Sequence, residues 1–136
     1  MCIRDRLASY PDVFAAGAIV AGLPYGAASS MQEAFGAMFH PQPHTGADWG
    51  DRVRGASGLT GAWPRVSVWQ GDADHTVAPQ NAREIIKQWL DVHGLDATPD
   101  TLLKVGRSTE ETWLDAEGRI VVELSLIHIS EPTRPY

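Results

Sequence analysis

The apolar and polar positions of this chain predict two strands that belong to a parallel sheet. Residues 13–22 read VFAAGAIVAG, a short apolar run between turn residues. Such a run is typical of a strand that is buried on both faces. Residues 65–70 read RVSVWQ and predict a second strand, with Val66, Val68 and Gln70 on one side.

Two further stretches have the period of amphipathic helices. Residues 30–39 begin with Ser30 and Glu33 in the S-x-x-E spacing of a capping box. Pro79 opens the second helix, and Gly94 suits its C-terminal stop. We expect one face of each helix to pack on the core: Met31, Ala34, Phe35, Met38 and Phe39 in the first, and Ala82, Ile85, Ile86, Trp89, Leu90 and His93 in the second.

The remaining pattern completes an α/β order. Residues 47–57 predict a weaker helix, and residues 7–10 the last turn of another. Residues 109–114 and 119–123 flank a turn whose glycine can adopt positive φ, which predicts a β-hairpin. Strands that alternate with helices predict the α/β class, with a mostly parallel sheet and flanking helices.

Composition narrows the class of protein. The chain has 136 residues, enough for one domain at most. It is 43% hydrophobic and 21% charged, which excludes a disordered chain, and its net charge of −6 argues against a nucleic-acid partner. The longest apolar run is shorter than the roughly 18 residues of a membrane span. Cys2 is the single cysteine, so no internal disulfide is possible.

The two ends of the chain read as the two strands of one short DNA element. Residues 1–6 can be encoded by ATGTGTATAAGAGACAG, and the reverse complement of that string encodes Leu-Ser-Leu-Ile-His, which is the sequence of residues 124–128. Both strings resemble translated sequencing adapter. We therefore interpret residues 1–6 and 124–136 as artefact and residues 7–123 as a domain truncated at both ends.

Polar side chains follow the two predicted parallel strands. Functional groups in open α/β sheets gather at the carboxyl ends of strands. The candidates are therefore residues 23–27, after the first strand, and residues 71–76, after the second. The second segment contains three titratable groups, Asp72, Asp74 and His75.

Four stretches resemble one family of enzymes. Residues 71–81, GDADHTVAPQN, are similar to the G-x-x-D-x-x-V-x-P-x-N stretch of α/β-hydrolase esterases, in particular the polyhydroxybutyrate depolymerase and feruloyl esterase group. Residues 10–16 resemble the segment after that family's nucleophile helix, and residues 21–28 its next strand end. Residues 115–123 resemble the hairpin before its catalytic histidine. The resemblance covers essentially all of residues 7–123.

The resemblance implies a Ser-Asp-His triad in that chain order. Asp74 maps onto the acid. The sequence contains no G-x-S-x-G elbow for the serine, and the histidine would follow Glu123, where the adapter-like tail starts. We do not expect His75 to be the base, because it adjoins the acid, or His128, because adapter sequence explains its codon. The 136-residue chain is therefore expected to be inactive.

The resemblance also implies a substrate and a location. The parent enzyme would hydrolyse carboxylic esters of a polyester or of plant cell walls through an acyl-enzyme, without a metal or other cofactor, and would be extracellular. Tyr25 is the candidate substrate-binding residue, and Trp49 and Trp63 are further aromatic candidates for a groove. The oligomeric state does not follow from the sequence.

Two other functions stay open at the level of sequence. One is a binding module that keeps a hydrolase scaffold without its triad; a G-x-S-x-G motif upstream would distinguish it from the esterase. The other is a metal-dependent hydrolase. Its ligands would be drawn from Asp72, Asp74, His75, His40 and His44, although their spacing matches none of the strong metal-ligand motifs.

Overall fold

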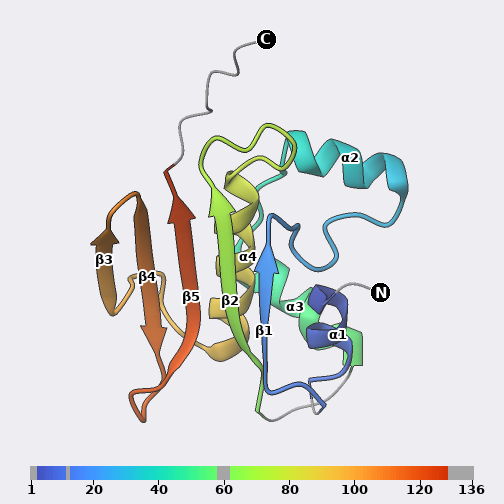
Figure 1. Cartoon of the computed structure of the whole chain (residues 1–136). Coiled ribbons are helices and arrows are strands. Elements are labelled where there is room, and N and C mark those ends of the chain that lie inside the picture. The colour runs from blue at the N-terminus through green and yellow to red at the C-terminus, as the bar shows by residue number, and fades with distance from the viewer. Residues whose placement is uncertain (1–2, 12, 58–61, 129–136) are drawn as a thin grey trace.

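The computed structural model describes residues 3–11, 13–57 and 62–128, which form a five-stranded mixed sheet with helices (Figure 1). The strand order is β1-β2-β5-β4-β3; β1, β2 and β5 are parallel, and β4 is antiparallel to both of its neighbours. This confirms the predicted α/β class. The strands are β1 (Ala16–Val20), β2 (Arg65–Gly71), β3 (Thr101–Val105), β4 (Ser108–Leu114) and β5 (Ile120–Ile127). The helices are α1 (Ile3–Ser9), α2 (Met31–Phe39), α3 (Gly46–Ser57) and α4 (Gln80–His93).

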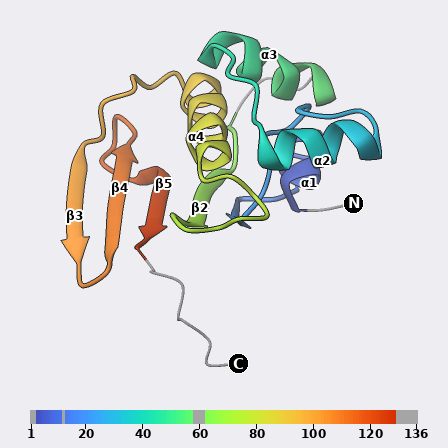
Figure 2. The same cartoon turned by 90° about the horizontal axis from the view of Figure 1, so that it is seen from above.

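Helices α1 and α4 pack on one face of the parallel part of the sheet, and α3 packs against both of these helices (Figure 2). The core lies between this face and α4, with Trp89 fully buried and Trp113 2% exposed. Burial of such aromatic side chains supplies much of the apolar area that stabilises a small domain. The same cluster includes Leu7, Val53, Val66, Val68, Ile85, Val122 and Leu124.

Helix α4 follows the sequence prediction closely. Its predicted stripe from Ala82 to Leu90 is buried, and Gly94 ends the helix with φ of 71°, a left-handed conformation that favours glycine. The amide of Leu95 then donates to the Leu90 carbonyl at 2.9 Å. With 14 residues, α4 is the longest described helix, and no described helix is long and apolar enough to cross a membrane.

The predicted hairpin is present, but its second strand is longer than expected. Asp115 accepts hydrogen bonds from the amides of Glu117 and Arg119, each at 2.9 Å, and so closes the turn. Strand β5 then continues past residue 123. Leu124 is fully buried and Ser125 is 4% exposed, and both pair with β2 and β4. The first four residues of the adapter-like tail therefore form part of the sheet.

The prediction for α2 is confirmed for its start and wrong for its packing. Ser30 is the N-cap, and its hydroxyl accepts a hydrogen bond from the Glu33 amide at 3.2 Å. The expected apolar face is open, however: Met31 is 78% exposed and Phe35 is 55% exposed. This face is exposed because α2 lies beyond the carboxyl edge of the sheet and has no described strand beneath it. The C-terminal end of α2 is bound to α4, where the Asn81 side chain donates to the carbonyls of Ala37 and Met38.

The strand predicted at residues 13–22 is shorter and less buried than expected. Strand β1 buries Ile19, whereas Val20 is 70% exposed. Helices cover only one face of this part of the sheet, so the alternate residues of β1 face outward.

Strand β3 was not expected, and Leu102 and Leu103, on its opposite faces, are both more than half exposed.

Candidate functional site

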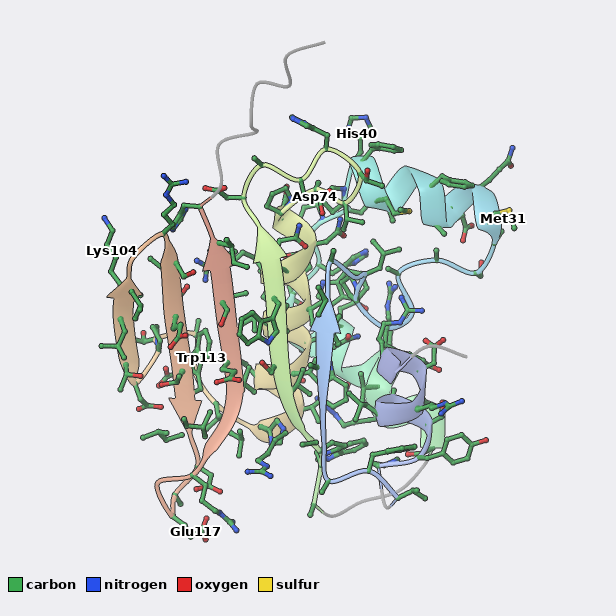
Figure 3. All side chains as sticks on the ribbon, viewed as in Figure 1. Met31, His40, Asp74, Lys104, Trp113 and Glu117 are labelled. Carbon is green, nitrogen blue, oxygen red and sulfur yellow. The ribbon has the colours of Figure 1, made fainter. Side chains whose placement is uncertain are left out.

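The loop after β2 holds Asp74 at the carboxyl end of the parallel strands, as the sequence predicts (Figure 3). Its carboxylate is fixed on both oxygens. Oδ1 accepts the backbone amides of Thr76 at 2.8 Å and Val77 at 3.0 Å. Oδ2 accepts the side-chain amide of Gln70 at 3.2 Å. The polypeptide therefore orients this carboxylate before any ligand or partner side chain arrives.

These donors also favour the charged form of Asp74. The backbone amide of Val77 lowers the pKa of the carboxyl group most, and the Thr76 amide, the Gln70 side chain and the neighbouring His75 lower it further. Partial burial acts in the opposite direction, but the net shift is downward. Asp74 is thus a carboxylate anion at neutral pH. The aspartate of a catalytic triad needs this charged form in order to orient the histidine and stabilise its imidazolium.

The lowered pKa predicts a pH-dependent contribution of Asp74 to stability. An acid with a depressed pKa in the folded state stabilises that state above its unfolded pKa and loses this effect as pH falls through the folded value. Asp74→Ala should therefore lower the free energy of unfolding at about pH 7, and the difference from the wild type should shrink below about pH 4. Urea unfolding at several pH values measures this; a difference that does not change with pH would contradict it.

The histidine after β5 contacts a different aspartate. His128 Nδ1 lies 2.7 Å from Asp72 Oδ2, and its Nε2 lies 3.1 Å from the hydroxyl of Thr109. The structure thus brings together an acid from the end of β2 and a histidine from the end of β5, but this pair is exposed and does not include Asp74. The neighbouring His75 acts on Asp74 by its charge, which lowers the pKa of the carboxyl group. His75 is exposed at the surface of the loop.

Tyr25 lies in the loop after β1, and its backbone is held by α4. The Gln88 side chain accepts from the Tyr25 amide and donates to the Tyr25 carbonyl, each at 2.8 Å. The Tyr25 ring packs against the hydrophobic core. The structure therefore shows a packing role for this ring, and substrate contact stays a prediction.

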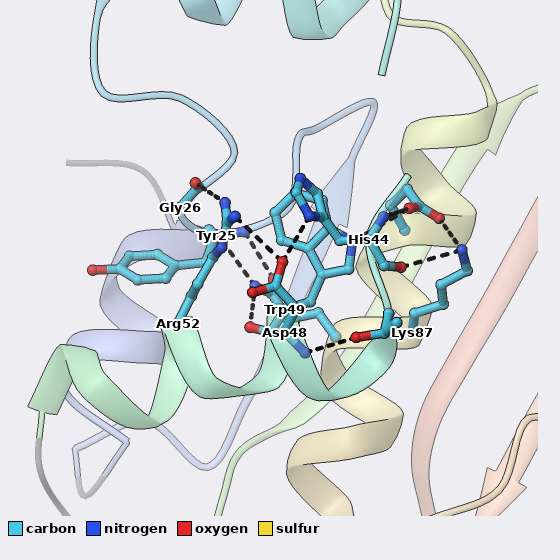
Figure 4. A network of polar contacts seen from close by, with 10 residues as sticks. Tyr25, Gly26, His44, Asp48, Trp49, Arg52 and Lys87 are labelled. Atoms are coloured by element: carbon cyan, nitrogen blue, oxygen red, sulfur yellow. Dashed lines mark hydrogen bonds and ion pairs between the residues drawn. The ribbon is translucent and has the colours of Figure 1, made fainter. Parts of the chain in front are cut away.

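The two tryptophans proposed for a groove lie in different places. Trp49 is 2% exposed, and its indole Nε1 donates to Glu84 at 3.3 Å. His44 packs edge-on against its ring and Arg52 stacks over it (Figure 4). Trp63 lines a pocket of about 680 Å³ at the amino ends of β2 and β5, the edge opposite to Asp74. The structure does not bring these rings together into one groove.

The residues suggested for a metal site do not converge. The His44 ring lies 2.6 Å from Asp48 instead, within the network of Figure 4. Among residues 3–11, 13–57 and 62–128, no group of three or more His, Cys, Asp or Glu side chains could hold a metal ion. The proposed set of Asp72, Asp74, His75 and the two loop histidines therefore lacks a structural basis.

Sequence reasoning missed a set of buried polar side chains. Three lie on α4, where they bind the backbone or side chains of residues 24–49, and the fourth is on β2. One signal was visible, because Gln70 continues the row of Val66 and Val68 on the covered side of the strand. A polar residue in such a row needs partners. The four residues are Gln70, Asn81, Glu84 and Gln88, each no more than 2% exposed.

Comparison with known proteins gives the relatives of this chain. No family model matches it. It is 44% identical over 117 residues to poly(3-hydroxyalkanoate) depolymerase C of Paucimonas lemoignei, a match that covers 85% of this chain and 28% of that protein. It is 41% identical over 107 residues to an acetylxylan esterase of Coprinopsis cinerea and 40% identical over 108 residues to feruloyl esterase B of Thermothelomyces thermophilus. The chain spans 28% and 36% of these two relatives.

A solved structure supports the fold. An acetyl xylan esterase from Aspergillus awamori superposes with a TM-score of 0.80 over 91% of this chain and 47% of that protein, at 24% sequence identity. The two proteins therefore share one α/β fold over the matched part. The chain is a homologue of the polyhydroxyalkanoate depolymerase, feruloyl esterase and acetylxylan esterase family, and it matches part of the length of each relative.

Proposed function

We propose that this chain is part of a serine esterase and that Asp74 is the acid of its Ser-Asp-His triad. The relatives named above are a polyester depolymerase and two cell-wall esterases, so the substrate class is a carboxylic ester of a polyester or of plant cell walls. The enzyme acts outside the cell. The observation that carries the assignment is the preorganised, charged Asp74 at the carboxyl end of β2.

The role of Asp74 follows from its charge and fixed geometry. A serine hydroxyl attacks the ester carbonyl while the histidine takes its proton, and the alcohol leaves after the histidine protonates it. Water, deprotonated by the histidine, then attacks the acyl-enzyme and releases the carboxylic acid product and the free serine. Throughout, the carboxylate holds the imidazole in one tautomer and stabilises its positive charge. No cofactor takes part in this sequence of steps.

Asp74 is a better candidate for the acid than Asp72, although Asp72 contacts His128. The Asp74 carboxylate is held by three protein donors, and its pKa is lowered by them. The side chain of Asp72 is 41% exposed and that of its partner His128 is 42% exposed. Water therefore weakens the electrostatic interaction that an acid of the triad must exert.

The 136-residue chain itself is predicted to be inactive as an esterase, because it contains no G-x-S-x-G elbow to supply the nucleophile. The purified chain is mixed with a p-nitrophenyl butyrate substrate, and the release of p-nitrophenol is measured. We expect the chain to release p-nitrophenol no faster than buffer alone does, and we expect the same of the Asp74→Ala variant. Turnover by the chain that the variant loses would show that the triad is complete within it.

A further inference from the structure

Gln70 is a buried amide in a row of apolar residues. It is 2% exposed and follows Val66 and Val68 on the face of β2 that the helices cover. An amide buried without hydrogen bonds costs free energy, whereas a leucine or valine would continue the row at no such cost. The presence of glutamine here therefore calls for a role that an apolar side chain does not perform.

The contacts of Gln70 are concentrated on the loop that carries Asp74. Its Nε2 lies 3.2 Å from each of three acceptors: the Gly71 carbonyl, the Val77 carbonyl and Asp74 Oδ2. Gly71 and Val77 are the two ends of the turn around Asp74. The two N–H groups of Nε2 are thus shared among both ends of the turn and one carboxylate oxygen within it.

We propose that Gln70 is a positioning residue that holds the Asp74 carboxylate in its working orientation. With Oδ1 bound to the amides of Thr76 and Val77, the Gln70 amide prevents rotation of the carboxylate by holding Oδ2. An ionised carboxylate oxygen has two lone pairs, so Oδ2 retains one for the imidazole N–H of a catalytic histidine. This inference rests on the proposed role of Asp74 in the triad.

The test is an NMR titration of the Asp74 carboxyl carbon in the 136-residue chain. Gln70→Met keeps the size and shape of the side chain but removes its donor, and we expect the pKa of Asp74 to rise toward its ordinary value. Gln70→Glu places a second carboxylate beside Oδ2, and we expect a larger rise because like charges repel. If one variant is poorly folded, the other still tests whether the Gln70 side chain affects the pKa of Asp74.

Gln88 offers a matched control. It is also a buried glutamine that donates to backbone carbonyls, those of Tyr25 and Trp49, and its side-chain hydrogen bonds within the described part of the chain join it to the backbone. Gln88→Met should lower stability and leave the Asp74 titration unchanged. The proposal is overturned if Gln70→Met leaves that titration where it is in the wild type, or if Gln88→Met moves it as far.

Different results would contradict the triad role of Asp74 and the positioning role of Gln70. In the full-length gene product, Gln70→Met should lower kcat about 10- to 100-fold with little change in KM, because the histidine is less well oriented. If Asp74→Asn leaves hydrolysis unchanged, the triad assignment is wrong whatever the titration shows. If Asp74→Asn abolishes hydrolysis but Gln70→Met changes neither kcat nor the titration, only the positioning role is wrong.

Discussion

Asp74→Asn in the full-length gene product should lower kcat for ester hydrolysis by about 10³- to 10⁴-fold while KM changes little. Asparagine has the size of aspartate but no charge, so it neither fixes the tautomer of the histidine nor stabilises the imidazolium. The hydrogen bonds that Oδ1 accepts from Thr76 and Val77 can persist with the asparagine oxygen. The loss should therefore appear in the chemical step, and steady-state kinetics on a p-nitrophenyl ester measure it.

Asp72→Asn is the matched control for this prediction. Asp72 lies two residues away in the same loop and is also an aspartate, but its side chain is 41% exposed. We expect the kcat of Asp72→Asn to stay within about threefold of the wild type, because water screens the charge of an exposed carboxylate. A large loss in Asp72→Asn together with normal activity in Asp74→Asn would transfer the role of the acid to Asp72.

Ending the chain after Glu123 should unfold it. Leu124 is fully buried and pairs with Val68, and Ser125 pairs with Trp69 on one side and Glu110 on the other. Loss of a buried leucine side chain alone costs about 2–5 kcal/mol, compared with about 5–15 kcal/mol for the whole stability of a typical domain. The shortened chain also loses the backbone pairing that joins β2 to β4 through the end of β5.

A chain that ends at His128 provides the control, because it retains all of β5 (Ile120–Ile127). We expect this chain to unfold cooperatively in urea with the midpoint of the full sequence. The chain that ends at Glu123 should show no cooperative transition and no dispersed amide spectrum. A native-like spectrum for the shorter chain would show that residues 124–127 add nothing to the sheet, whatever DNA encodes them.

The sequence predicts much of the framework of this fold because local signals and tertiary packing agree there. Helix α4 carries a complete set of signals, with Pro79 at its start, a buried stripe and Gly94 at its end. Strand β2 and the hairpin turn of Asp115 and Gly118 are equally clear. The position of Asp74 also follows from the sequence, since strand ends are where functional groups gather in such sheets.

The exposure of α2 and the burial of polar residues on α4 were not predicted. They depend on which elements pack beside each helix, and the sequence of the helix alone does not indicate this. Phe35 and Met31 have the spacing of a packed face, yet α2 has no sheet beneath it. The polar residues Glu84 and Gln88 share α4 with the apolar stripe and are buried only because the loop of Tyr25 and helix α3 cover them. A helical period identifies one buried face, and these residues form a second one.

The partners of Asp74 in the site illustrate the same limit. The motif around Asp74 indicates an acid, but its hydrogen bonds depend on the turn that brings Val77 and Gln70 to the carboxylate. The contact between Asp72 and His128 depends on the register of β5 against β2, which pairs Gly71 with Ile127. Register follows from the packing of the whole sheet and not from any one strand.

The DNA on both sides of codons 7 and 123 tests the proposed function most directly, and long-read sequencing of the source genome provides it. We expect an open reading frame with a G-x-S-x-G motif upstream of codon 7, a histidine codon shortly after codon 123, and no adapter-like codons. That result would give Asp74 both of its triad partners. A genome that encodes residues 1–6 and 124–136 as they stand, with no serine elbow upstream, would contradict the esterase assignment and favour a binding module instead.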